Sequence, residues 1–266
     1  MKLPHFLVII LCSLAGYAQP PSAKIRYEYY LTMVNDTNPD LSSKVEMVLD
    51  VAPDTTFFAE KNFINFQNDV HTAYQSTDRK TYIKLLQQAN QKNNQSHYLL
   101  IKSTDNENIT YEKFKQQKFY INETRKNLVW DIDSTEFTWN NFTVKKATAV
   151  CDGRLWTVYF TEDIATQSGP YKLNNLPGFV VKAWDKHNHF IFEYVKSENL
   201  IHTPVYIHKP ESYAELSVHE KKVLKEVFYP HLASNKNDET RATLDKLRDI
   251  ENPIDLSFIE KTTIMH

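Results

Sequence analysis

Histidines are the first residues in this chain whose spacing could support chemistry. His187 and His189 lie two positions apart, and imidazole nitrogens at that spacing can share a zinc or copper ion. His202 and His208 follow closely in the sequence. No cysteine or carboxylate pattern completes a ligand set, and two histidines in a polar turn are usually solvated. We therefore predict no metal site and no cofactor.

Carboxylates and the thiol of Cys151 are the other reactive groups considered. Asp131 and Asp133 place two carboxylates on one face of a predicted strand, but glycosidases need separations that a sequence does not give. Cys151 lies on a predicted strand, where a lone cysteine is usually a small buried apolar residue. No phosphate-binding loop, nucleotide fingerprint, Gly-x-Ser-x-Gly or His-Glu-x-x-His motif is present. These patterns favour a protein without catalytic activity and assign no catalytic residue.

An aromatic strand is the main candidate for binding. Along residues 154–161, Trp156, Val158 and Phe160 share one face, while Leu155 and Tyr159 share the other. Apolar side chains on both faces predict a central strand that is covered on both sides. If the cover is incomplete, Trp156, Val158 and Phe160 would line an apolar groove for a lipid, a peptide or a partner chain. A fully packed core is the alternative.

The first 18 residues have the pattern of a secretory signal peptide. Lys2 precedes an apolar run at 6–14, and the small residues Gly16 and Ala18 predict cleavage near Ala18–Gln19. We therefore expect export to the periplasm, the cell envelope or the exterior. After cleavage Cys151 is the only cysteine, which excludes an internal disulfide. The rest of the chain has no segment long and apolar enough to span a membrane. The mixed charge, formally −2, does not favour binding of nucleic acid.

Alternating apolar residues predict a protein dominated by strands, joined by short loops that favour antiparallel pairing. The predicted strands are 25–33, 45–51, 56–59, 97–102, 118–122, 127–132, 136–139, 142–150, 154–161, 179–184 and 190–194. The fold class is α+β: a large, curled, mostly antiparallel sheet in the form of a half-barrel or open barrel, with two or three helices, one of which follows the last strand.

Three turns are predicted between these strands. Asp152-Gly153 is a strong hairpin signal. Pro177-Gly178 fits a type II turn, in which Gly178 would adopt a positive φ. The segment 185–188 turns the chain into a second hairpin.

Helical spacing appears in two places. Residues 77–90 predict a helical insertion, capped within 76–78 and followed by a solvated loop at 87–95, in a sheet domain that covers 19–210. Residues 211–266 predict a helical segment packed on or beside the sheet. Its cap would be Ser212 with Glu215, or Ser217 with Glu220. Its apolar stripe comprises Leu216, Val223, Leu224, Val227 and Phe228.

A motif within 169–180 resembles the GLPGLI family of Bacteroidetes. The family's Gly-Leu-Pro-Gly-Leu-Ile motif corresponds here to 175–180, with Asn175 at the first glycine. Segments 146–148 and 153–154 and the strand that carries Trp156 also match. The resemblance is specific over about 130–195, and it implies an exported protein of unknown function. The motif residues are Gly169, Pro170, Tyr171, Lys172, Asn175, Leu176, Pro177, Gly178, Phe179 and Val180.

The sequence thus favours an exported, non-enzymatic protein that binds an apolar ligand or a partner in the outer membrane or envelope. The alternative is an envelope hydrolase that uses carboxylates or histidines. A purely structural envelope component is the third hypothesis.

Overall fold

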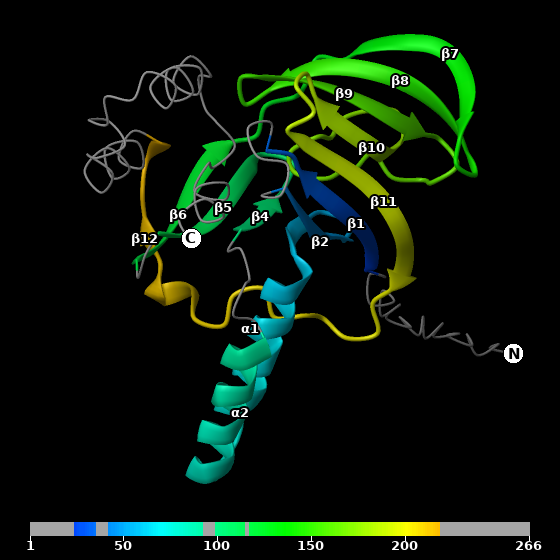
Figure 1. Cartoon of the computed structure of the whole chain (residues 1–266). Helices are drawn as coiled ribbons and strands as arrows, with labels where there is room; N and C mark the ends of the chain where they lie inside the picture. The colour runs from blue at the N-terminus through cyan, green and yellow to red at the C-terminus, as the bar shows by residue number, and fades with distance from the viewer. Residues whose placement is uncertain (1–23, 36–41, 93–98, 115–116, 219–266) are drawn as a thin grey trace, which may run out of the picture.

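The computed structural model describes residues 24–35, 42–92, 99–114 and 117–218. The expected signal peptide and nearly all of the expected C-terminal helical segment lie outside these residues. The described residues form one large sheet and a pair of helices that extends from it (Figure 1).

The sheet has twelve strands in the order β12-β6-β5-β4-β3-β2-β1-β11-β10-β9-β8-β7. The strand bounds are β1 Ile25–Met33, β2 Ser43–Val51, β3 Thr56–Glu60, β4 Leu99–Ser103, β5 Glu107–Phe114, β6 Gln117–Thr124, β7 Asp131–Trp139, β8 Phe142–Cys151, β9 Arg154–Thr161, β10 Phe179–Asp185, β11 Phe190–Asn199 and β12 Ala214–Glu215. Neighbouring strands are antiparallel except for the short β12, which pairs in parallel with β6. The sheet curls but does not close, because β12 and β7 remain as edges (Figure 1). The prediction of a large, mostly antiparallel sheet in an α+β fold is confirmed.

The hairpin turns follow from the residues that accept a positive φ. Asp152 has φ 48° and Gly153 has φ 75°, as a type I′ turn requires, so β8 and β9 form the predicted hairpin. Asn188, with φ 58°, lies in the turn between β10 and β11. Residues 131–132 and 136–139 of the two strands predicted at 127–132 and 136–139 belong to a single strand, β7, with an irregular register after Asp133, whereas residues 127–130 are not in a strand.

The main core lies on the inner face of the curled sheet. Trp156, Val158 and Phe160 of β9 are almost completely buried there with apolar residues of β1, β2, β10 and β11. On the other face of β9, Leu155 remains 42% exposed. Thr157 and Tyr159 on the same face are half-buried, so the outer face of β9 is only partly covered, in contrast to the prediction that both faces are covered.

Two helices follow β3: α1 Lys61–Tyr74 and α2 Arg79–Lys92 (Figure 1). Asp78 caps α2, since its carboxylate accepts hydrogen bonds from the backbone N–H groups of Lys80 and Thr81, as the sequence predicts. The helix continues to Lys92, so the loop expected from residue 87 is wrong over 87–92. Helix α1 was not predicted; its buried residues are Phe63, Ile64, Gln67 and Ala73. Its apolar stripe is short and includes a glutamine.

We call the strands from β12 to β2 in the order of the sheet its first half, and those from β1 to β7 its second half. The segment 200–213, which we call the strap, runs beside α1 on the outer face of the first half (Figure 1). The backbone N–H of Val205 donates to Asn68, and that of His208 donates to Gln67, both at 2.8 Å. Tyr206 stacks on Phe57 with ring centroids 3.7 Å apart. With α1, the strap covers a second apolar cluster that includes Val48, Ala59, Phe63, Ile64 and Leu100.

The strap also contains one of the predicted helix caps. Ser212 ends a single 3-10 turn, η2 Pro210–Ser212, and Glu215 belongs to β12. A capping box of Ser212 with Glu215 is therefore wrong. The alternative cap with Glu220 and the predicted apolar stripe lie outside the described residues, apart from Leu216.

Strand β5 was also missed from the sequence. Its buried side chains are Asn108, Thr110 and Glu112, so the inward positions are polar. Ile109 and Tyr111 alternate with these polar residues, but two apolar residues are a short signal, and Tyr111 packs against the apolar cluster under α1 and the strap rather than in the main core.

Candidate functional site

The motif at 169–180, which resembles the GLPGLI motif, covers the second part of the long loop between β9 and β10 and the first two residues of β10. Its two glycines allow close packing. A β-carbon on Gly169 would lie 2.3 Å from the carbonyl oxygen of Leu173 and 2.8 Å from Val180. A β-carbon on Gly178 would lie 2.3 Å from the carbonyl oxygen of Thr161. Gly178 does not have a positive φ, so the predicted type II turn is wrong. Glycine is needed at 178 because β9 approaches too closely for a side chain.

Two other motif residues do have a positive φ. Asn175 has φ 70°, in agreement with its position at the family's first glycine. Tyr171 has φ 58°, an uncommon conformation for an aromatic residue that its surroundings must stabilise.

These surroundings are a network of charges around Lys172. Its ammonium lies 2.8 Å from Glu123 Oε2 on β6 and 3.0 Å from Asp152 Oδ2 in the β8–β9 turn. The Tyr171 hydroxyl donates to the same oxygen of Asp152 at 2.5 Å. Because β6 and β8 belong to opposite halves of the sheet, Lys172 connects the two halves.

The ionisation of this network does not suit catalysis at neutral pH. Burial alone would lower the pKa of Lys172, but Asp152 and Glu123 outweigh it and raise this pKa, so the ammonium stays charged. Burial and Asp152 raise the pKa of Tyr171. Burial, followed by Asp152, raises the pKa of the Cys151 thiol to about 12. The phenol and the thiol are therefore both protonated, so neither is an ionised nucleophile, and the two carboxylates of the network are paired with Lys172.

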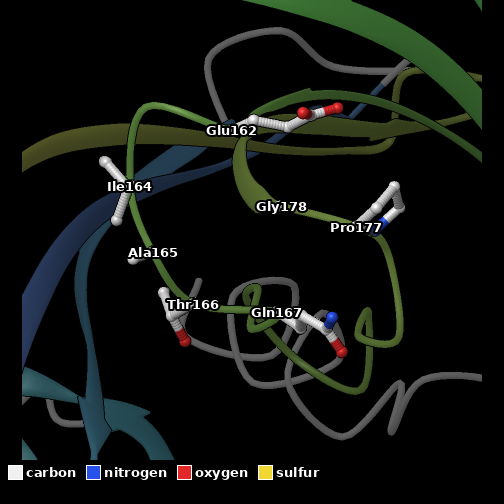
Figure 2. A pocket seen from close by; sticks show the side chains of 7 residues that line it. All are labelled: Glu162, Ile164, Ala165, Thr166, Gln167, Pro177 and Gly178. Atoms are coloured by element: carbon white, nitrogen blue, oxygen red, sulfur yellow. The ribbon is translucent and has the colours of Figure 1, made fainter.

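An open hollow of about 370 Å³ lies beside the second half of the motif (Figure 2). It is lined by Glu162, Ile164, Ala165, Thr166, Gln167, Pro177 and Gly178. Glu162 already pairs with Lys145 at 2.9 Å. The hollow therefore combines one paired carboxylate with small and neutral side chains.

The groove expected over Trp156, Val158 and Phe160 is not formed by these residues. All three side chains are buried in the main core, so they do not line an open surface. The packed-core alternative describes them correctly.

The histidines and carboxylates considered in the sequence do not converge. The rings of His187 and His189 stack with centroids 5.5 Å apart, whereas His208 lies beside His71 of α1, with the two Nδ1 atoms 3.4 Å apart. His202 is exposed. Asp131 and Asp133 are exposed on the edge strand β7. Among the described residues, no group of three or more His, Cys, Asp or Glu side chains is placed to hold a metal ion.

The outer face of the second half of the sheet has a feature that the sequence analysis missed. Its strands bring together a set of half-buried and exposed side chains, which we call the outer aromatic patch. Its members are Phe137, Trp139, Tyr159, Lys182, Trp184 and Glu193. The Tyr159 ring lies 4.9 Å from Phe137 and 4.9 Å from Trp184, both nearly edge-on. The alternation of β9 places Tyr159 opposite the core, but its neighbours come from three other strands and could not be inferred locally.

A lysine lies among these rings. The Lys182 ammonium is 5.6 Å from the ring centre of Trp139 and 5.8 Å from that of Trp184, within the range of cation–π attraction. It also pairs with Glu193 at 3.0 Å. No described helix covers the patch, whereas α1 and the strap cover the outer face of the first half (Figure 1).

Comparison with known proteins supports the fold alone. A solved structure of PNGF-II in space group C2 superposes with a TM-score of 0.51 and 11% identity, over 76% of this chain and 32% of that one. PNGF-II in space group P21 gives a TM-score of 0.49 and 12% identity, over 76% of this chain and 33% of the PNGF-II chain. An uncharacterised conserved protein from Thermus thermophilus gives a TM-score of 0.35 and 7% identity, over 74% and 91%. This chain thus spans about a third of the PNGF-II chains. No family model and no curated protein matches the sequence.

Proposed function

We propose that this chain is an exported protein of the cell envelope that binds a ligand or partner without catalysis, and that the outer aromatic patch is its binding surface. The observation that carries the proposal is that described elements cover the outer face of the sheet in one half and not in the other. Where α1 and the strap lie, the outer face is apolar and covered. Where no described element lies, the outer face still presents Phe137, Trp139, Tyr159 and Trp184.

A solvated sheet face is normally polar, so large aromatic side chains on such a face indicate a surface that is covered during function. Tryptophan and tyrosine are also the residues that contribute most strongly to binding at interfaces. The hydrolase alternative has no comparable support, because the described carboxylates and histidines do not converge and the ion pairs around Lys172 are satisfied.

Substitution of two patch residues tests whether this surface binds an apolar probe. We expect the folded protein to enhance the fluorescence of anilinonaphthalene sulfonate at neutral pH. Tyr159→Ser together with Trp184→Ser should weaken this binding several-fold while the far-UV circular dichroism spectrum is kept. Tyr82→Ser on the distant α2 is the matched control and should bind the dye like the original protein. Equal dye binding by the patch variant and the control would contradict the proposal.

Export and family membership are part of the same proposal. The predicted leader and the resemblance of 169–180 to the GLPGLI motif support them. No described helix is long and apolar enough to cross a membrane. We also infer that a helix follows the last strand, from the apolar spacing after residue 215. Expression with the full leader, followed by intact mass analysis, should give a chain that begins at Gln19. A secreted chain that keeps Met1 would contradict cleavage.

A further inference from the structure

The centre of the outer aromatic patch is a row of side chains on four neighbouring strands. Tyr159 of β9 is paired in register with Lys182 of β10, and Lys182 with Glu193 of β11. Glu193 is in turn paired with Tyr30 of β1. Because neighbouring strands are about 4.8 Å apart, this row is about 14 Å long. An aromatic ring thus lies at each end, with an ion pair between them.

The ion pair argues against a purely apolar ligand. The side chains of Lys182 and Glu193 are 25% and 39% exposed, so both keep contact with water. A lipid chain or an apolar peptide side chain laid over the row would remove this water and return no hydrogen bond. Glu193 already neutralises Lys182, so the row gives no net attraction to an anion, and an anionic aromatic dye would be held by the surrounding rings alone.

A neutral ligand rich in hydroxyl groups suits the same surface. Hydroxyl groups both donate and accept, so they can replace the water around an ammonium and a carboxylate together. The C–H groups on the face of a sugar ring carry a slight positive charge and can pack on the negative faces of aromatic rings. Trp139 and Trp184 flank the ammonium, and Tyr159 and Tyr30 lie at the ends of the row.

From this arrangement we propose that the outer aromatic patch binds a short neutral oligosaccharide, whose hydroxyl groups contact Lys182 and Glu193 while its ring faces pack on the aromatic side chains. The proposal rests on the proposed function, because it names the class of ligand for the same surface. The length of the row is sufficient for a few sugar units.

The test is a titration of the mature chain with chitotriose, cellotriose and maltotriose, which differ in linkage and substituents. Binding is followed by tryptophan fluorescence, since Trp139 and Trp184 lie in the patch, and by calorimetry. At least one sugar should give a saturable change. Lys182→Met and Glu193→Gln should each weaken binding tenfold or more. Lys84→Met, an exposed lysine of α2, is the matched control and should leave the affinity unchanged.

The outcomes separate this proposal from the proposed function. One outcome is that the double variant Tyr159→Ser with Trp184→Ser loses dye binding while none of the three sugars binds the original protein at 10 mM. In that case the surface binds an apolar ligand and the oligosaccharide proposal is wrong. If a sugar binds equally to the Lys182→Met, Glu193→Gln and Lys84→Met variants, its site lies elsewhere and the proposal is also wrong. If neither dye nor sugar depends on the patch, both proposals fail.

Discussion

Gly178→Ala is expected to lower the melting temperature on the order of 10 °C. The new β-carbon would lie 2.3 Å from the carbonyl oxygen of Thr161 and 3.1 Å from Phe160. The first contact is with backbone, which cannot rotate away as a flexible side chain can. Thr161 is also the register partner of Phe179, so relief of the clash would separate the first pair between β9 and β10. Overpacking of this kind costs about 3 kcal/mol, at the upper end of its usual range.

A second substitution distinguishes close packing from backbone conformation as the reason for this glycine. If Gly178 needed a positive φ, Gly178→Asn would be milder than Gly178→Ala, because asparagine tolerates that conformation better. If close packing is the reason, asparagine is at least as harmful as alanine. Asn175→Gly is the control in the same loop and should change stability little, since Asn175 has φ 70° and glycine adopts that value easily. Thermal unfolding, monitored by circular dichroism, distinguishes close packing from backbone conformation as the explanation. Unchanged melting of Gly178→Ala would contradict both.

Asp50→Ala is expected to destabilise the protein by about 3–5 kcal/mol, as measured by chemical denaturation. Asp50 is fully buried on β2, and both of its oxygens accept hydrogen bonds from Arg26 of β1, at 2.6 and 2.7 Å. The Tyr206 hydroxyl in the strap donates to the same carboxylate at 2.9 Å. Removal of the carboxylate leaves a buried guanidinium without its counter-ion and detaches the strap at this point.

The double variant Arg26→Met with Asp50→Leu tests this explanation. It removes both charges together, so it should recover much of the stability that Asp50→Ala loses. Asp54→Ala is the control, since Asp54 is exposed in the turn between β2 and β3. If Asp50→Ala were no more harmful than Asp54→Ala, the buried pair would contribute little to the fold.

The candidate surface could be predicted only in part. Alternation along β9 places Tyr159 opposite Trp156, Val158 and Phe160, and this follows from the period of a strand. The alternation does not show which of the two faces of β9 is buried in the core. We expected the face with Trp156 to line a groove, but the curl of the sheet buries it, whereas Tyr159 on the opposite face is only partly buried.

Local patterns in the sequence determined most of the strands, the Asp152-Gly153 hairpin and the Asp78 cap. Each depends on residues within a few positions of one another, so alternation, positive φ and a capping carboxylate are sufficient to predict them. Tertiary structure alone decided the rest. The polar inward face of β5, the contact of Lys172 with Glu123, and the need for glycine at 178 all depend on segments far apart in the chain. A local pattern shows which side chains share a face, but the elements that pack against a face determine whether it becomes core or binding surface.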